Sequence, residues 1–215
     1  MSAETPPPDV SPADGASPPR RASAGPHRSK ASSEAILDAA EALLAEAGYG
    51  GFSIEQVARR AGAGKPTIYR WWPSKAALLL DVYARQKLQL DQDDTGALET
   101  DLAALIGGLW RFWRETAAGG AFRSIIAEAQ SDPAAMAALN GFMAERRHHI
   151  AGAFERAARR GELADDIDLD AVIDIISGYA WSRLLTGRID DDPAAIAHAA
   201  RQIARGVVRP GWALT

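Results

Sequence analysis

The segment 52–72 constrains the fold of this chain more than any other stretch. Ser53 precedes a run of helically spaced apolar residues, and Gln56 follows three residues later, as in a capping box at a helix start. Gly62 ends the run, since glycine adopts the left-handed conformation without a Cβ clash. Pro66 suits the first turn of a second helix, where a missing N–H costs nothing. The pattern predicts two short helices joined by a tight turn, which is a helix-turn-helix.

The second predicted helix has a polar and basic outer side. Ile68 and Trp72 are four residues apart and face inward, so the side chains between them point outward. Lysine and arginine pair with phosphates, while hydroxyl groups donate to phosphate oxygens or meet base edges. Two plain core helices are the alternative interpretation, because this geometry also occurs without DNA binding. The candidate DNA-contacting residues are Ser53, Gly64, Lys65, Pro66, Thr67, Tyr69, Arg70, Trp71 and Lys75.

Two expected roles divide these candidates. We assign Tyr69 and Lys75 to phosphates, because Lys75 lies at a predicted helix N-terminus whose backbone N–H groups can join it on one phosphate. We assign Lys65 and Thr67 to the reading of base edges. The sequence therefore predicts that the first pair sets affinity for all DNA and that the second pair sets sequence preference.

A dense set of residues within 28–82 follows a known pattern: Ile36-Leu37-Asp38-Ala39-Ala40, Leu43-Leu44, Gly48-Tyr49, Ser53-Ile54-Glu55-Gln56-Val57-Ala58, Ala61-Gly62, Thr67-Ile68-Tyr69-Arg70-Trp71-Trp72-Pro73-Ser74-Lys75 and Leu78-Leu79. It resembles the DNA-binding domain of the tetracycline-repressor (TetR) family. The resemblance implies a regulator that binds double-stranded DNA at a palindromic operator. Pro66 departs from the family pattern, where a small residue is common, and Trp71-Trp72 replaces a common His-Phe pair. Both departures keep the shape and leave the base preference open.

A sparser match follows along the chain: Ile126-Ala127-Glu128-Ala129-Gln130, Asp132-Pro133, Arg146-Arg147, Arg159-Arg160-Gly161-Glu162-Leu163 and Arg183-Leu184-Leu185-Thr186-Gly187. These residues look like one C-terminal subfamily of TetR regulators. In that family the second domain is a helical module that binds a small-molecule effector and pairs with its mate through its last two long helices. The resemblance implies the same effector binding and homodimer here.

Helical apolar spacing continues through the rest of the chain, where alanine is frequent and β-branched residues are sparse. We predict an all-α fold of about nine helices. Its regions are a disordered tail over 1–29, a helix-turn-helix DNA-binding domain over 30–90, and a helical effector-binding and dimerisation domain over 91–215. Outside the helix-turn-helix, the expected helices span 33–47, 75–90, 96–117, 122–130, 132–160, 168–186 and 192–208, with a break at Gly119-Gly120.

The net charge of −4 conceals an uneven distribution of charged residues. Residues 20–90 contain 11 Lys and Arg against 6 Asp and Glu, whereas residues 91–215 contain 13 against 19. The basic part can approach phosphate and the acidic part is repelled by it. The tail lacks large apolar groups and ends with Arg20, Arg21 and Arg28. It is either a solubilising segment or an arm that contacts DNA beside the main site.

Residues 168–186 predict a helix that is apolar on more than one face, so the helix must be buried on more than one side. We expect it to form a homodimer together with 192–208, and we place Trp181 in that contact. A central core helix in a monomer is the alternative. Symmetric dimers also match the way helix-turn-helix proteins read paired half-sites.

An unusual supply of aromatic residues indicates an effector pocket in the second domain. The candidate pocket residues are Trp110, Trp113, Phe122, Phe142, Met143 and Trp181. The pair Trp110 and Trp113 shares a helix face and is the preferred pocket wall. Polar groups are expected from Arg123, Gln130, Asn140 and His148. Simple filling of the core is the alternative interpretation for each of these residues.

Other kinds of chemistry find no support in the sequence. The cysteine count is 0, and no apolar run is long enough to cross a bilayer or to serve as a signal peptide, so we expect a cytoplasmic protein away from membranes. His148 and His149 are adjacent and point about 100° apart on a helix, so they cannot share a metal. There is no phosphate loop, nucleophile elbow or H-E-x-x-H motif. We expect no enzyme, cofactor or metal.

The sequence thus predicts a dimeric transcriptional regulator, in the form of a repressor that a small-molecule effector releases from DNA. One alternative is an architectural or adaptor DNA-binding protein without an effector. A second is an all-α enzyme with an incidental helix-turn-helix, which the absence of an acid, base or nucleophile cluster disfavours.

Overall fold

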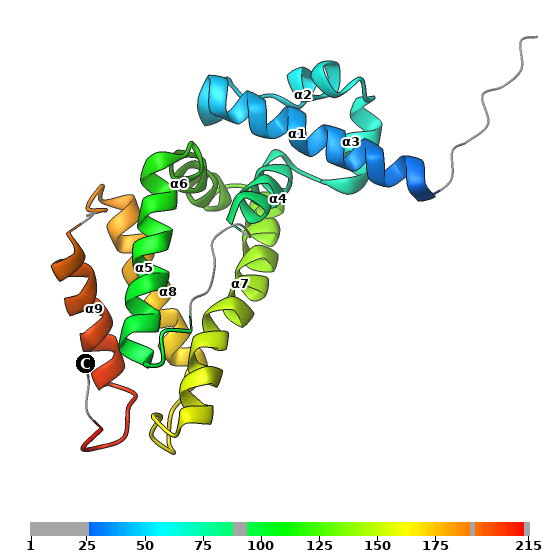
Figure 1. The fold of residues 1–215 in the computed structure, drawn as a ribbon. Coiled ribbons are helices and arrows are strands. Elements are labelled where there is room, and N and C mark those ends of the chain that lie inside the picture. Colours follow the sequence, from blue (N-terminus) through cyan, green and yellow to red (C-terminus); the bar gives the residue numbers. More distant parts are fainter. Residues whose placement is uncertain (1–25, 88–93, 190–191, 213–215) are drawn as a thin grey trace, which may run out of the picture.

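The computed structural model describes residues 26–87, 94–189 and 192–212, and these form an all-α fold, as the sequence predicts (Figure 1). The helices within this part of the chain are α1 (Pro26–Gly51), α2 (Ile54–Ala61), α3 (Lys65–Trp71), α4 (Lys75–Lys87), α5 (Leu98–Glu115), α6 (Ala118–Ala129), α7 (Pro133–Arg160), α8 (Leu169–Leu185) and α9 (Pro193–Arg205).

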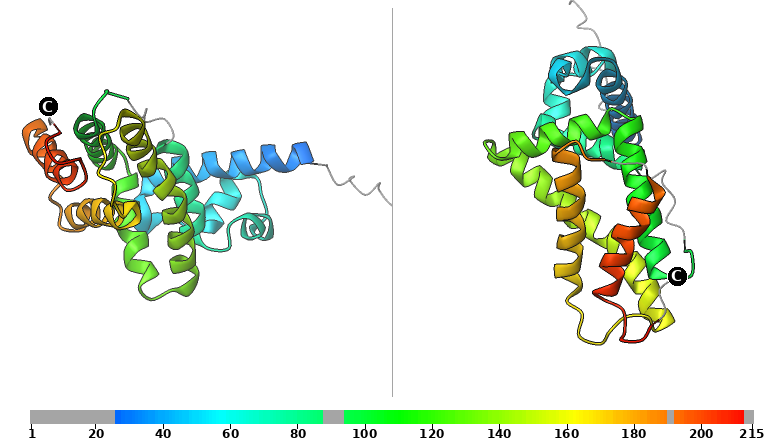
Figure 2. Two further views of the ribbon diagram at one scale, coloured as in Figure 1. Left: turned by 90° about the horizontal axis from the view of Figure 1, so that it is seen from below. Right: turned by 90° about the vertical axis from the view of Figure 1, so that its left-hand side faces the viewer.

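Helices α1, α2 and α3 form a separate head at one end of the molecule (Figures 1 and 2). Its centre is a set of buried apolar side chains that includes Ile36, Leu44, Val57, Ile68 and Trp72. The predicted inward position of Ile68 and Trp72 is therefore confirmed. Because the inward side of α3 is used for this packing, its opposite side faces solvent.

Local capping fixes the ends of α2 as the sequence predicts. The Gln56 backbone N–H donates to Ser53 Oγ over 3.3 Å, and the Ser53 hydroxyl donates to Gln56 Oε1 over 3.0 Å. Gly62 has φ 62° and ψ 28°, the left-handed conformation that closes the helix. These contacts set the angle at which α3 leaves the turn.

Helix α1 is longer than predicted at its N-terminal end. It begins at Pro26, whereas the apolar spacing predicts a start at residue 33. Apolar periodicity marks only the buried part of a helix, and no large apolar residue precedes Ile36 in this helix to extend the pattern. Residues 26–29 are therefore helical rather than part of a disordered tail, and residues 1–25 lie outside the described part. At the other end, the helical geometry breaks at Gly48 (φ 61°), where the sequence predicts the exit.

Helix α4 joins the head to the rest of the molecule (Figure 1). It packs against α1 on one side and against α6 and α7 on the other. The Arg85 guanidinium bridges α4 to α1 through Asp38 (2.6 Å) and Glu41 (2.8 Å). The Tyr49 hydroxyl also donates to Glu128 of α6, which ties the end of α1 to the body, as we call helices α5 to α9. A movement of α4 would therefore displace contacts with α1 and with α6 and α7.

The junction between α5 and α6 differs from the prediction. The expected break at Gly119-Gly120 is wrong, because both glycines lie inside α6 and the chain turns at Thr116 and Ala117. A Cβ at Gly119 would lie 2.4 Å from the Trp113 carbonyl oxygen. The glycine is needed for close approach between helices, which looks the same in sequence as a helix stop.

Helices α7, α8 and α9 complete the fold. Helix α7 starts at its Asp132 cap and ends at Gly161 (φ 77°), both as predicted. Helix α9 packs along α5, and α8 contacts α6 and α7 (Figure 2). Buried Asp101 and Glu162 are paired with Arg160 where the ends of α5 and α7 meet. This body carries the second functional feature of the molecule.

Candidate DNA interface and effector cavity

The outer side of α3 and the turn before it form the candidate DNA interface. Tyr69 is 49% exposed and Trp71 is 44% exposed, which is unusual for large aromatic side chains. The Arg70 guanidinium lies 5.7 Å from the centre of the Trp71 ring. Lys65 and Pro66 are exposed and Thr67 is partly buried at the start of the helix. These predicted residues thus surround α3 except along the strip packed at Ile68 and Trp72, and their individual contacts with DNA stay predictions.

Two of the predicted residues are already engaged within the head. The Lys65 ammonium pairs with Glu55 of α2. The hydrogen bond from Lys65 lowers the pKa of the Glu55 carboxyl. Ser53 caps α2 and is partly buried. Both groups must exchange these partners or keep them when DNA approaches.

Lys75 holds a different environment from the rest of the set. Its ammonium donates to the Tyr49 carbonyl oxygen over 2.9 Å and lies 3.7 Å from the centre of the Tyr49 ring. Partial burial lowers the pKa of Lys75. The side chain therefore ties the start of α4 to the end of α1, a packing role that spacing alone did not indicate. Its assignment to phosphate stays a prediction.

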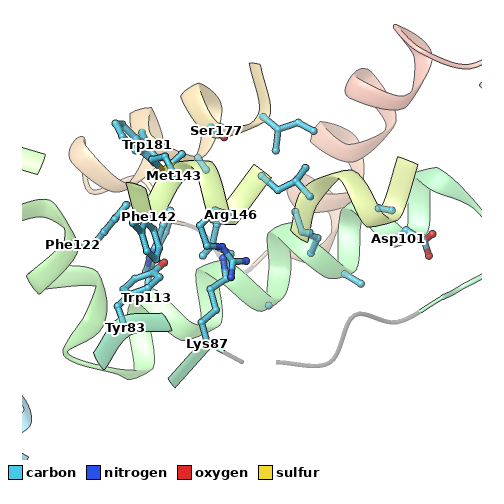
Figure 3. A pocket seen from close by; sticks show the side chains of 18 of the residues that line it. Tyr83, Lys87, Asp101, Trp113, Phe122, Phe142, Met143, Arg146, Ser177 and Trp181 are labelled. Atoms are coloured by element: carbon cyan, nitrogen blue, oxygen red, sulfur yellow. The ribbon is translucent and has the colours of Figure 1, made fainter. Parts of the chain in front are cut away.

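A cavity opens within the body between α4, α5, α6, α7 and α8 (Figure 3). Its volume is about 100 Å³. Its wall combines aromatic rings with a few polar groups, as in small-molecule sites. The lining includes Tyr83, Lys87, Asp101, Leu105, Leu109, Trp113, Phe122, Phe142, Met143, Arg146, Ile150, Arg156, Ile176, Ser177 and Trp181.

Five of the six predicted pocket residues line this cavity, and Trp110 does not. The Trp110 ring instead lies 5.9 Å from the Tyr179 ring and 5.3 Å from the Arg183 guanidinium. Positions i and i+3 are about 60° apart around a helix, and α5 packs against different neighbours over that angle. Trp113 faces this cavity, whereas Trp110 lines a second hollow beside Arg111 and Ile196, so the two do not share one wall, and their role toward an effector stays a prediction.

The predicted polar groups are also not those of the cavity. Arg123, Gln130, Asn140 and His148 are exposed on the outside of α6 and α7 or in the turn between them. The polar groups that line the cavity include Tyr83, Lys87 and Arg146. Their helical spacing was a usable signal, because Tyr83 and Lys87 are four residues apart, as are Phe142 and Arg146. The prediction missed them because lysine and arginine are ordinarily surface residues.

Trp181 belongs to this interior side of α8. Its ring meets the Phe122 ring edge-on at 5.8 Å, and it lines the cavity (Figure 3). Trp181 is also partly exposed, and its expected place in a contact between two copies stays a prediction. The large apolar residues that α8 exposes are Ile175 (64%) and Leu185 (50%).

Burial and charge shape the chemistry of the cavity. The Tyr83 hydroxyl accepts a hydrogen bond from Trp113 Nε1 over 2.8 Å, and burial raises the pKa of Tyr83 far above its usual value. Burial, together with the charge of Arg146, holds the pKa of Lys87 well below its usual value. The pKa of Arg146 is lowered by burial as well. The cavity therefore holds a neutral phenol beside a lysine and an arginine side chain.

The described residues contain no cluster of His, Cys, Asp or Glu suited to a metal ion. None of the helices in this part of the chain is long and apolar enough to cross a membrane.

Comparison with known proteins identifies the family of both parts of the chain. Residues 36–82 match the family described as bacterial regulatory proteins of the tetR family, and residues 92–203 match the tetracyclin repressor-like C-terminal domain. The chain is 32% identical over 163 residues to YdeS of Bacillus subtilis, described as an uncharacterized HTH-type transcriptional regulator, with 75% of this chain and 82% of the relative covered.

Two further similar proteins match this chain over nearly their whole length. The chain is 30% identical over 187 residues to the DNA-binding transcriptional repressor TetR of Mycobacteroides abscessus, with 86% of this chain and 97% of the relative covered. The crystal structure of the TetR family transcription regulator SCO0332 superposes with a TM-score of 0.72 at 30% identity, covering 82% of this chain and 98% of that one.

The chain belongs to the TetR family. It is a DNA-binding transcriptional regulator with an N-terminal helix-turn-helix head and a helical C-terminal domain. Membership places it among transcription factors rather than enzymes, as the sequence predicts.

Proposed function

We propose that this regulator is a homodimeric repressor, and that a small molecule entering the cavity releases it from a palindromic operator. The observation that carries the proposal is the position of α4. This helix begins four residues after α3 ends, and its last two turns supply Tyr83 and Lys87 to the cavity wall. A molecule that displaces that wall moves the element on which the head is mounted.

The size of the cavity supports coupling between ligand and DNA. A volume of about 100 Å³ is smaller than the ~300–1,000 Å³ typical of drug-sized sites. A ligand with even one aromatic ring must push the walls apart, and α4 is one of those walls. A dimer needs recognition helices ~34–36 Å apart to meet successive major grooves, so a small change in their separation weakens binding.

The exposed face of α8 supports the homodimer. Ile175 and Leu185 are large, apolar and mostly exposed on this helix, and Gly178 lies exposed between them. A second copy that covers this face buries the apolar groups and allows close approach of helices at the glycine. We include α9 in the same contact and place the molecule in the cytoplasm, where it meets DNA.

The domain boundaries follow from the same proposal. We assign residues 30–90 to DNA binding and residues 91–215 to effector binding and dimerisation, with the segment before residue 30 as a basic tail. The position of α4 supports a part in both functions, because it packs on α1 and also lines the cavity.

The test begins with the promoter DNA beside the gene of this protein. A palindrome found there should bind the full-length dimer in a gel-shift or fluorescence-anisotropy titration, and a cavity ligand should lower that affinity by at least about tenfold, which corresponds to ~1.4 kcal/mol of coupling. The alternative is an architectural or adaptor protein without an effector. Tight operator binding that no cavity ligand alters would favour that alternative.

A further inference from the structure

Each of two neighbouring helices presents an aromatic ring and a cation to the cavity at the same spacing. Tyr83 and Lys87 lie four residues apart on α4, and Phe142 and Arg146 lie four residues apart on α7. The rings of Tyr83 and Phe142 meet edge-on at 5.3 Å. Figure 3 shows the Lys87 side chain rising from α4 toward Arg146, so that their nitrogen atoms lie together beside the aromatic cluster.

These two cations face each other without a carboxylate among the described residues. Neither forms a salt bridge within that part of the chain, whereas Asp101, at the far end of the cavity, already pairs with Arg160 at 3.2 Å. Like charges in a partly buried site repel one another more strongly than in water. An arrangement of this kind costs stability unless an anion offsets it.

A third donor lies beside the cations. Tyr83 is 3% exposed, its hydroxyl accepts from Trp113, and none of the hydrogen bonds within the described residues uses the hydroxyl's own proton. Burial keeps the phenol protonated, so the proton is available to an acceptor in the cavity. One end of the cavity therefore offers hydrogen-bond donors and positive charge, while the rest of its wall is aromatic and aliphatic.

We propose that the effector is an amphipathic organic anion whose head is held by Lys87, Arg146 and the Tyr83 hydroxyl and whose apolar body lies among Trp113, Phe122, Phe142 and Trp181. The anionic head bridges α4 to α7, because its two cations come from different helices. The apolar body forces the rings apart. This inference names the ligand class for the proposed function and rests on it only for the effect on DNA.

Matched pairs of compounds test the class directly. The probes are 2-naphthoate, 4-phenylbutyrate and decanoate, each with its uncharged primary amide, titrated into the full-length protein at pH 7 by calorimetry. At least one carboxylate should bind about tenfold or more tightly than its amide, since charge-assisted hydrogen bonds are worth roughly 1.4 kcal/mol or more. Equal affinity within every pair, preference for the amides, or binding of none of the six compounds would overturn the proposal.

Variants locate the anionic head. Lys87→Gln and Arg146→Gln should each remove most of the preference for carboxylate over amide, and Lys87→Arg should retain it. Arg123→Gln is the matched control, because this arginine lies on α6 next to Phe122 of the cavity but is exposed. Melting curves confirm that each variant folds. A preference that survives both Gln variants would place the anion elsewhere and refute the assignment.

The same compounds added to the operator complex separate the two proposals. Carboxylates that bind through Lys87 and Arg146 without loosening DNA would leave the anion site standing and overturn ligand release. Amides that bind and release DNA as well as the carboxylates would preserve ligand release and overturn the anionic class.

Discussion

In the head of this protein, the candidate DNA-contacting residues of α3 and its flanking turns lie within twelve consecutive positions, Gly64 to Lys75. In the body, the cavity residues come from five helices and extend from Tyr83 to Trp181. The outward face of α3 follows from local rules of capping and spacing, because α3 is short and packs on one side only. No local rule places the cavity residues. Each helix of the body has several neighbours, and the packing of the whole domain decides which neighbour a side chain contacts.

Helix α4 connects these two kinds of site. Its first turn holds Lys75 against Tyr49 of the head, and its last turns hold Tyr83 and Lys87 in the cavity. A change in either site can therefore reach the other through one rigid element rather than through a long chain of contacts. If the proposed ligand release is right, the coupling is reciprocal, so a substitution that shifts α4 should change ligand binding and DNA binding together, whereas one on the exposed side of α3 should change DNA binding alone.

The largest expected effect concerns the dimer that brings two heads together on one operator. Ile175→Glu combined with Leu185→Glu places charge on the exposed face of α8 and should dissociate the dimer while leaving each subunit folded, because neither side chain belongs to the buried core. Operator affinity should fall by at least about a hundredfold, as the two half-sites no longer act together. Sedimentation and anisotropy measure both quantities.

Arg188→Glu, at an exposed position beyond α8, serves as the control for added negative charge. A double variant that remains dimeric would show that this face of α8 does not form the dimer. A monomer that binds the palindrome as tightly as the original protein would show that DNA binding by the head does not require dimerisation.

The next effect separates base reading from phosphate contact within the head. Thr67→Ala and Lys65→Ala should change which operator sequences are preferred, by roughly 1–3 kcal/mol at the affected positions. Tyr69→Ala should weaken binding to all sequences alike. Selection from randomised operators followed by sequencing measures the preference. An unchanged preference for the Thr67 and Lys65 variants would remove them from the base-reading set.

A smaller effect concerns the pH dependence of the cavity. In the folded protein, Lys87 faces Arg146 and His149 of α7 and lies one turn from Tyr83 on α4, and its pKa is below that of the unfolded chain. Between those two pKa values the unfolded chain binds more protons, so stability rises with pH. Lys87→Met should therefore raise the melting temperature by several degrees at pH 7, and its advantage should shrink as pH rises.

Ligand affinity should follow the same titration with the opposite sign. Binding of a carboxylate probe should be strongest below the folded pKa of Lys87 and should weaken as pH rises through it, because the ammonium loses its charge. Lys87→Gln should flatten this profile. A wild-type profile that is already flat over the whole pH range in which the protein stays folded, measured by calorimetry, would remove Lys87 from the anion site.

The smallest effect concerns the N-terminal segment, which lies outside the described residues. Deletion of 1–19 removes no Lys or Arg and should leave DNA affinity unchanged, whereas deletion of 1–25 also removes Arg20 and Arg21 and spares the start of α1 at Pro26. If both arginines meet phosphates, the slope of log affinity against log salt should shrink by about 0.9 for each. Identical slopes for the two truncations would leave the segment without a role in binding.

Much of the head could be predicted from sequence for an identifiable reason. The Ser53 cap, the Gly62 termination and the inward position of Ile68 depend on residues within a few positions of each other. The start of α1 at Pro26 escaped prediction, because no large apolar residue precedes Ile36 in this helix and the apolar pattern therefore begins too late. The glycines of α6 were misread for a related reason, since close packing against Trp113 and helix termination both call for glycine.

The cavity shows the limit of such reasoning. Aromatic content indicated a pocket, and Trp113, Phe122, Phe142, Met143 and Trp181 do line one. Trp110 and Trp181 show what remained open, because both lie on apolar helix faces but only packing decides which neighbour each face meets. Lys87 and Arg146 went unnoticed, since a cation beside an apolar stripe looks like a solvated edge until another helix covers it.

The sequence by itself determined the helical class, the helix-turn-helix and the family, because capping, turn chemistry and apolar periodicity act over short stretches of chain. The tertiary structure alone decided which faces of α5 and α8 line a cavity and which face α9 or solvent. It also brought two cations from α4 and α7 together beside a buried phenol. That juxtaposition depends on how helices distant in sequence pack, and packing energy is a property of the whole core rather than of any segment.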